Sequence, residues 1–178
     1  SSMVQRAPDL HGGINFRDIG GYATRDGRHV VWRKLLRSGH LANLSVSDLS
    51  VMSSMGVNQV HDFRRDDERL RSPSKVINVE VFSDYNISVG SLSRFWDYLR
   101  EGNLTTRSAQ NLVTDSYSDC IEEVAPAFTR FLRSILNNSQ GTSVFHCAAG
   151  KDRTGMAAAL ILSALDVPRA TIIEDYLL

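Results

Sequence analysis

The sequence predicts an α/β domain with a central, mostly parallel, twisted sheet that is flanked by helices. Short apolar segments rich in β-branched residues alternate along the chain with longer segments in which apolar residues recur every three or four positions. Strands separated by helices tend to pair in parallel, because a parallel connection needs a long crossover. The 178 residues, 42% of them hydrophobic, suffice for one core of ordinary size. We therefore expect a single domain over residues 1–178.

The first half of the chain supplies most of the expected strands. Residues 14–22, INFRDIGGY, have the composition of a loop, and their paired glycines suit tight backbone geometry. Residues 29–39 predict a short strand that runs into a loop. A helix is expected over 47–55, where one face is apolar and a glycine follows. Residues 57–63, VNQVHDF, predict a buried strand, and residues 75–82, KVINVEVF, predict a further strand because β-branched residues dominate them.

The residue pattern of the segment from 91 to 138 is typical of helices. RFWDYL at 94–99 is one candidate, and residues 107–136 form a longer one with apolar side chains at helical spacing. Pro126 lies inside the longer stretch, so we expect it either to kink the helix or to start a new one. Cys120 falls on the apolar face of this stretch and is expected to be a core residue.

The last part of the chain combines a strand, a loop and two helices. GTSVFHC at 141–147 predicts a short strand, and residues 150–165 predict an apolar helix. Another helix is expected to begin near Pro168, since proline is well tolerated in a first turn. That helix reaches Leu178 without a cap or a polar tail, so we expect the natural chain to continue beyond it.

The composition excludes several functional classes. Lysine and arginine balance aspartate and glutamate at 20 each, so no nucleic-acid partner is expected. The first residues lack the basic-then-apolar layout of a secretion signal. The longest apolar run, 156–165, is about half the length needed to cross a bilayer, so no integral membrane segment is expected. We expect a cytoplasmic protein, or one secreted by a route without a cleavable signal peptide. Two cysteines are too few for a disulfide framework, which directs attention to thiol chemistry.

Residues 146–155, HCAAGKDRTG, join the predicted strand to the apolar helix. Such a loop points successive backbone N–H groups and a helix N-terminus at one spot, and that spot binds an anion such as phosphate. Cys147 stands at the mouth of the loop, where the helix N-terminus and a nearby arginine should lower its pKa and make it a thiolate nucleophile. Arg153 follows six residues later and can hold two phosphate oxygens. The pair suits phosphoryl transfer to cysteine, followed by hydrolysis.

This stretch resembles the C-x5-R phosphate loop of cysteine-dependent phosphatases of the tyrosine phosphatase superfamily. It is most similar to the bacterial and fungal tyrosine-phosphatase-like group, which acts on phosphotyrosine and on phosphoinositides. Four more segments fit that group, so that the resemblance spans nearly the whole chain: NFRDIGGY, LLRSGHLANLS, HDFRRDDE and IIEDYLL. The resemblance implies a tyrosine-phosphatase-like fold and a phosphomonoesterase that needs neither metal nor cofactor and works through a phosphocysteine intermediate.

The resemblance also assigns roles to the matching residues. Cys147 is the expected nucleophile, and Thr154 carries the hydroxyl that hydrogen-bonds its sulfur and helps it leave. His146 is expected to order the loop. The backbone that cradles the phosphate is expected to run through Ala148, Ala149, Gly150, Lys151, Asp152 and Arg153.

The general acid is less clear, because the Trp-Pro-Asp loop that tyrosine phosphatases usually carry is missing. Three aspartates are candidates. Asp152 lies inside the phosphate loop, at a position that the tyrosine-phosphatase-like group is thought to use, and we favour it. Asp84 follows a predicted strand where small dual-specificity phosphatases carry their acid. Asp62 ends another strand, at the edge where sites of such sheets gather, although it could instead pair with Arg17, Arg37 or Arg64.

Lys151 gives an indication of the class of substrate. A second cation beside the phosphate site favours a substrate with several phosphates. The expected partners are therefore phosphotyrosine-containing proteins, phosphoinositides or both, with transient contact to a membrane surface. The competing interpretation of Lys151 is a solvated lysine at a helix start.

Two other functions compete with a phosphatase. A catalytically impaired phosphate-binding module would keep the loop and lack the acid. The presence of Cys147, Arg153 and Thr154 argues against it, and the missing Trp-Pro-Asp argues for it. A rhodanese-like sulfur carrier also uses a cysteine loop, but it does not require the Asp-Arg-Thr-Gly continuation into a helix. The charged run RRDDERLR at 64–71 is expected to be a solvated surface with internal ion pairs.

Overall fold

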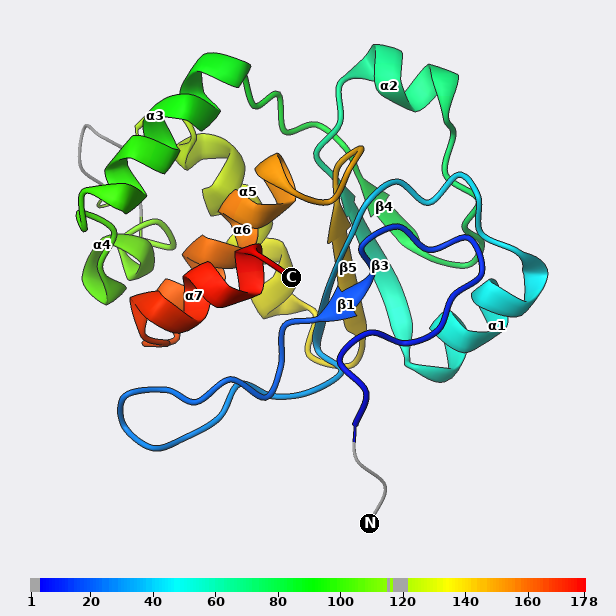
Figure 1. Ribbon diagram of the computed structural model, residues 1–178. Coiled ribbons are helices and arrows are strands. Elements are labelled where there is room, and N and C mark those ends of the chain that lie inside the picture. Colours follow the sequence, from blue (N-terminus) through cyan, green and yellow to red (C-terminus); the bar gives the residue numbers. More distant parts are fainter. Residues whose placement is uncertain (1–3, 115, 117–121) are drawn as a thin grey trace.

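The computed structural model describes residues 4–114, 116 and 122–178 (Figure 1). The helices and strands follow in the order β1 (Arg17–Asp18), β2 (Leu35–Ser38), α1 (Val46–Ser54), β3 (Val57–Asp62), α2 (Asp66–Arg71), β4 (Glu80–Phe82), α3 (Val89–Arg100), α4 (Thr106–Gln110), α5 (Ala125–Asn137), β5 (Thr142–His146), α6 (Asp152–Ala164) and α7 (Arg169–Tyr176). The predicted alternation of strands and helices is confirmed. The expectation for Cys120 falls outside the described residues.

The five strands of the described residues form one sheet in the order β1-β2-β5-β3-β4. β1 runs antiparallel to β2, whereas β2, β5, β3 and β4 pair in parallel, as the sequence predicted. The central strand, β5, is buried at all five residues. Its last residue, His146, is in register with Ser38 of β2 and with Asp62 of β3. The carboxyl ends of three strands therefore meet at one edge of the sheet, where sites of such folds are built.

Helices cover the two faces of the sheet unequally (Figure 1). α3 to α7 pack on one face, over a large core that includes Phe63 and most of α6. α1 covers the other face, over a smaller core that includes Leu36. β5 sends Phe145 into the large core and Val144 into the small one. The strand that leads into the loop at 147–151 is thus packed on both of its faces.

Local sequence signals explain where two helices begin. The Ser45 hydroxyl accepts the backbone N–H of Asp48 at 3.1 Å, and the Asp48 carboxylate accepts the N–H of Ser45 in return, which caps α1. The same carboxylate accepts the N–H groups of His11 and Gly12, and so ties the N-terminal loop to α1. Pro126 lies in the first turn of α5, and it therefore starts a helix instead of kinking one.

Two predicted strands differ from the expectation, one in length and one in position. Within residues 75–82 only β4 pairs with another strand. The positive φ of Asn78, 57°, interrupts the extended backbone before it. Within residues 29–39 the expected order of a strand followed by a loop is reversed: a turn comes first, and β2 lies at the end of the segment, after Arg33 with a φ of 58°. In both segments a left-handed residue lies shortly before the point where strand pairing starts.

Candidate active site

The thiol of Cys147 lies at the carboxyl end of the central strand and is 3% exposed. β5 ends one residue before it, and α6 begins five residues after it. The Thr154 hydroxyl, in the first turn of α6, donates a hydrogen bond to the Cys147 sulfur at 3.1 Å. The structure thus brings together the sulfur and the hydroxyl that the sequence paired.

The loop after Cys147 is held from outside through its carbonyl groups. Three consecutive carbonyls accept hydrogen bonds: Ala148 from the His40 N–H at 2.9 Å, Ala149 from Asn15 Nδ2 at 2.8 Å, and Gly150 from Arg37 Nη2 at 3.0 Å. In a planar trans peptide the C=O and the following N–H point in opposite directions. The N–H groups of the next three residues, 149–151, are therefore turned to the other side of the loop, which is where an anion would be held.

Gly150 is required by this arrangement. Its φ is +74°, a conformation that residues with a side chain rarely adopt. A Cβ at this position would lie 2.5 Å from the Gly39 nitrogen and 2.7 Å from the Ser38 carbonyl carbon. The loop therefore packs directly on the end of β2.

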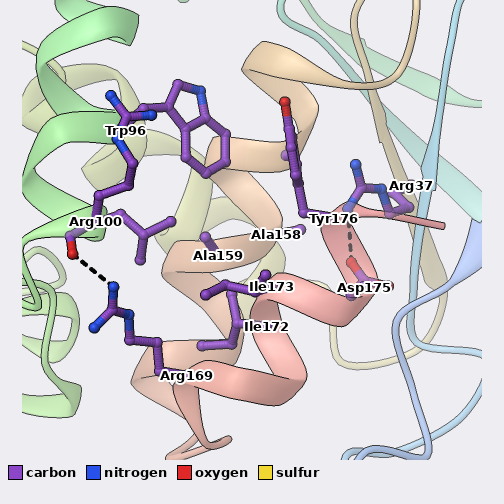
Figure 2. A pocket seen from close by; sticks show the side chains of 12 residues that line it. Arg37, Trp96, Arg100, Ala158, Ala159, Arg169, Ile172, Ile173, Asp175 and Tyr176 are labelled. Atoms are coloured by element: carbon purple, nitrogen blue, oxygen red, sulfur yellow. Dashed lines mark hydrogen bonds and ion pairs between the residues drawn. The ribbon is translucent and has the colours of Figure 1, made fainter.

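A buried cluster of charges supports the loop from behind. The Arg37 guanidinium is 1% exposed and binds the Asp175 carboxylate at 2.7 Å with its other Nη (Figure 2). Arg17 donates to the Asp175 carbonyl at 2.7 Å, and the Tyr22 hydroxyl donates to the Asp175 carboxylate at 2.7 Å. Burial, together with that hydrogen bond, raises the pKa of Tyr22. Asp175 on α7 is thereby linked through Arg37 on β2 to the carbonyl of Gly150.

Arg153 is held in one orientation by a carboxylate. Its two terminal nitrogens donate to the two carboxylate oxygens of Glu68 at 2.8 and 2.9 Å, and one of them also donates to the Phe63 carbonyl. The bonds from Arg153 lower the pKa of Glu68 to about 2. Burial alone would lower the pKa of Arg153, but the bonds to Glu68 and the nearby Cys147 sulfur outweigh it and raise that pKa. The Arg153 guanidinium is thus charged and held in one orientation.

Glu68 is the residue that sequence reasoning missed. It belongs to the run RRDDERLR, which the sequence predicted to be a solvated surface, and other members of that run do form exposed ion pairs such as Arg71 with Asp67. Glu68 instead caps α2, by accepting the N–H of Arg65, and turns its side chain toward Arg153. The sequence did carry one signal for Glu68, because it is the last residue of HDFRRDDE, one of the segments that resemble the family.

His146 and Asp62 lie buried behind the loop. The His146 side chain is fully buried, and its Nδ1 donates to the Cys147 carbonyl at 3.1 Å, while its Nε2 lies 3.7 Å from an Asp62 oxygen. Burial lowers the pKa of His146. Burial works to raise the pKa of Asp62, but the hydrogen bonds from Arg64 outweigh it and lower that pKa. The Asp62 carboxylate is thus ionised and paired with Arg64, one of the arginines that the sequence had offered as a partner.

The two remaining acid candidates are both exposed. Asp152 is the first residue of α6, inside the loop, and accepts a hydrogen bond from the Tyr176 hydroxyl at 3.4 Å. Asp84 follows β4 and accepts a bond from Asn86 Nδ2 at 3.0 Å. Of the three candidates, Asp152 combines an exposed carboxylate with a position in the loop.

Two further observations concern residues 4–114, 116 and 122–178. No helix in these ranges is long and apolar enough to cross a membrane. Nor do three or more histidine, cysteine, aspartate or glutamate side chains converge there in a way that would hold a metal ion. The groups that do converge at the carboxyl edge are a thiol, a hydroxyl, a guanidinium and backbone amides.

A thiol that precedes an arginine by six residues, around an amide-lined loop on a mostly parallel sheet, defines the class of cysteine-dependent phosphatases. Within that class, the model of the tyrosine phosphatase family matches residues 8–178. The chain belongs to the tyrosine phosphatase family.

Two curated relatives and one solved structure illustrate the similarity. A protein of Cupriavidus necator named as a candidate tyrosine-protein phosphatase is 36% identical over 165 residues, which are 92% of this chain and 59% of that protein. The triple specificity protein phosphatase PtpB of Mycobacterium tuberculosis is 29% identical over 95% of this chain and 67% of its own. The crystal structure of a cysteine-to-serine variant of P. aeruginosa TpbA in complex with pTyr aligns with a TM-score of 0.44 at 16% identity, over 83% of this chain and 70% of that one. The chain spans about three-fifths of the length of the first of these relatives.

Proposed function

We propose that this chain is a phosphatase domain that hydrolyses phosphate monoesters through a phosphocysteine intermediate on Cys147. The observation that carries the proposal is the convergence of three supports at one loop. The Cys147 sulfur accepts a bond from Thr154, and the loop carbonyls are bound from outside, while Glu68 fixes Arg153. Membership of the tyrosine phosphatase family supports the same reaction.

In the first step the Cys147 thiolate attacks phosphorus while the bond to the leaving oxygen breaks. Arg153 and the loop N–H groups hold the non-bridging oxygens as their charge redistributes. The leaving oxygen takes a proton from a general acid. In the second step water attacks the phosphocysteine and gives a proton to the carboxylate that acted as the acid, which restores the acid. The S–P bond breaks, and the hydroxyl of Thr154 stabilises the departing sulfur. The products of this step are inorganic phosphate and the regenerated cysteine.

Asp152 is the general acid in this proposal. Its carboxylate is exposed at the loop, whereas Asp62 is held as a buried carboxylate by Arg64. We expect Asp152→Ala to lower kcat on phenyl phosphate by about 100-fold or more, and on p-nitrophenyl phosphate by much less, because nitrophenolate leaves without a proton. Equal losses on both substrates would remove Asp152 from the acid role, and the same comparison with Asp84→Ala would then test Asp84.

The decisive experiment separates catalysis from phosphate binding. The chain should hydrolyse p-nitrophenyl phosphate in EDTA, and Cys147→Ser should abolish the hydrolysis while inorganic phosphate still binds. A wild-type chain that binds phosphate without turnover would support the impaired binding module instead. Activity that survives Cys147→Ser would exclude the phosphocysteine route.

The proposed substrates are phosphotyrosine proteins together with phosphoinositides. Lys151 is exposed beside the loop, and within the described part of the chain no carboxylate pairs with it. A second free cation there complements a second phosphate. The name of the relative PtpB, a triple specificity phosphatase, supports a broad substrate range. Transient contact with a membrane surface follows for a phosphoinositide substrate.

A paired assay tests the role of Lys151. Lys151→Ala should lower kcat/KM on a soluble phosphoinositide with two or more phosphates by about tenfold, and on a phosphotyrosine peptide by less than about threefold. A uniform loss on both substrates would argue against a lipid-specific role for the lysine.

A further inference from the structure

A pocket of about 190 Å³ lies beside the phosphate loop, between α3, α6 and α7 (Figure 2). Most of its lining is apolar: Trp96, Leu99, Ala158, Ala159, Ile172 and Ile173. An apolar cavity of about 150 Å³ is known to hold benzene. The pocket therefore has room for a ring or for a short alkyl chain.

The pocket has this volume because the residues of α6 that line it are small. Ala158 and Ala159 form its floor, and Gly155 lies one turn earlier on the same helix. A Cβ at Gly155 would lie 2.9 Å from the ring of Tyr176, so this ring packs directly on the helix. The rings of Tyr176 and Trp96 meet with centroids 4.7 Å apart, which closes one side of the pocket.

The mouth of the pocket carries a positive charge. Arg100 and Arg169 both line it, both are exposed, and Arg169 donates to the Arg100 carbonyl at 2.6 Å. Asp97 pairs with Arg100, which leaves the charge of Arg169 uncompensated by any ion pair within the described part of the chain. At the inner end Arg37 and Asp175 bind each other. The complementary ligand has an apolar body and one negative charge.

The walls of the pocket are also supports of the phosphate loop. Tyr176 donates to Asp152, and Arg37 binds the Gly150 carbonyl. A ligand that contacts the ring of Tyr176 would shift the hydrogen bond at Asp152. The bond is long and exposed, so a small displacement is enough to break it.

We propose that this pocket binds a small anionic amphiphile, an alkyl chain that ends in a single carboxylate, and that its occupation changes turnover through Tyr176. The inferred binding depends only on the pocket, whereas the inferred effect on turnover rests on the proposed phosphatase function.

Binding is tested with octanoate and is measured as a change in the tryptophan emission of the whole chain, since Trp96 forms part of the pocket wall. Octanoate should bind about tenfold more tightly than hexanoate, because two more methylene groups leave water. It should bind about fivefold more tightly than octanol, which has the chain without the charge. Acetate, which has the charge without the chain, should not bind. Equal affinity for octanoate and octanol, or measurable binding of acetate, would overturn the proposed ligand class.

Three variants locate the site. Ile173→Phe should abolish octanoate binding, since it fills the pocket from a side chain that is 39% exposed and so adds little strain. Combined Arg100→Gln and Arg169→Gln should weaken octanoate about fivefold and leave octanol unchanged. Arg107→Gln removes an exposed arginine of α4 that does not line the pocket, and should change neither. Octanoate affinity that survives Ile173→Phe in a folded variant would overturn the site.

The effect on turnover is measured on phenyl phosphate at saturating octanoate. The rate should change by at least about twofold in the wild-type chain, and the change should vanish in Tyr176→Phe, which keeps the ring and loses the hydroxyl. An unchanged rate in the wild-type chain would overturn the coupling. If the chain has no phosphatase activity, the emission titrations still decide whether the site binds octanoate.

Discussion

The two ends of the phosphate loop are supported very differently. The carbonyls of residues 148–150 accept bonds of 2.8–3.0 Å from distant parts of the chain, and Arg37 behind them is 1% exposed. Lys151 and Asp152 are exposed, and Asp152 accepts a bond of 3.4 Å from Tyr176. Bonds to buried charges are strong and costly to break, whereas exposed contacts of this length contribute little.

This difference separates two tasks within one loop. In the proposed function, the held end would cradle the phosphate group, which is the same in every substrate. The exposed end would supply the acid and the extra cation, which would meet the parts of a substrate that vary. We therefore expect substitutions behind the held end to damage folding and all activities together, and substitutions at the exposed end to change one substrate relative to another.

The largest effect is expected from Asp175→Asn. It removes the carboxylate that pairs with Arg37 at 2.7 Å and with Arg17 at 3.6 Å, and both arginines are buried. Removing one partner of such a buried pair costs about 3–5 kcal/mol of unfolding free energy. Urea denaturation measures this loss. Activity should fall on every substrate in the same proportion, because the Gly150 carbonyl loses its support.

The matched control is Asp166→Asn. Asp166 pairs with Arg25 at 3.1 Å, but both side chains are substantially exposed. The free energy of unfolding should change by less than about 1 kcal/mol. Equal losses for the two variants would contradict the distinction between the buried and the exposed ends of the network.

An intermediate effect is expected from Glu68→Gln, which releases Arg153. The kcat/KM on p-nitrophenyl phosphate should fall about ten- to a hundredfold, the range for one charged hydrogen-bond partner. Asp67→Asn on the same helix removes only exposed pairs and should change kcat/KM less than about twofold. Similar losses for both variants would mean that Glu68 acts through the charge of α2 and not through Arg153.

The same variant predicts a change in acid stability. The pKa of Glu68 lies at about 2 in the folded protein, below the ordinary value of 4.5. A lowered pKa stabilises the fold above the ordinary value, and this contribution is lost as the pH falls from about 4.5 to about 2. Glu68→Gln should therefore show a flatter decline of unfolding free energy across this pH window than the wild-type chain. An identical slope would contradict the ion pair with Arg153.

The smallest effect is expected from Tyr176→Phe, at the exposed end. It removes the 3.4 Å bond to Asp152 and keeps the ring contact with Trp96. The kcat on phenyl phosphate should change by about threefold, and the kcat on p-nitrophenyl phosphate should stay within about twofold. A uniform loss on both substrates would show that the hydroxyl supports the whole loop, and the two ends would then be less distinct than their contacts indicate.

The sequence predicted the contiguous part of the site and missed most of its supports. Cys147, Arg153 and Thr154 lie within eight positions, so a local pattern of strand, loop and helix is enough to bring them together. Glu68 binds Arg153 across 85 positions, and Asp175 binds Arg37 across 138 positions, so neither pairing leaves a local pattern. The starts of β4 and β2, shortly after Asn78 and Arg33, were not predicted for a related reason, because a single left-handed residue is weakly encoded by composition. The parallel sheet was predictable because it depends on alternation over the whole chain.

The link between Asp175 and Arg17 has a consequence for the order of assembly. These residues are 158 positions apart, and the bond between them is part of the support for Gly150. Contacts of such high sequence separation form late, since a long loop must close before they can. During synthesis the cysteine emerges well before α7 does. The nascent chain therefore carries its thiol for some time before α7 completes the contacts that support the loop.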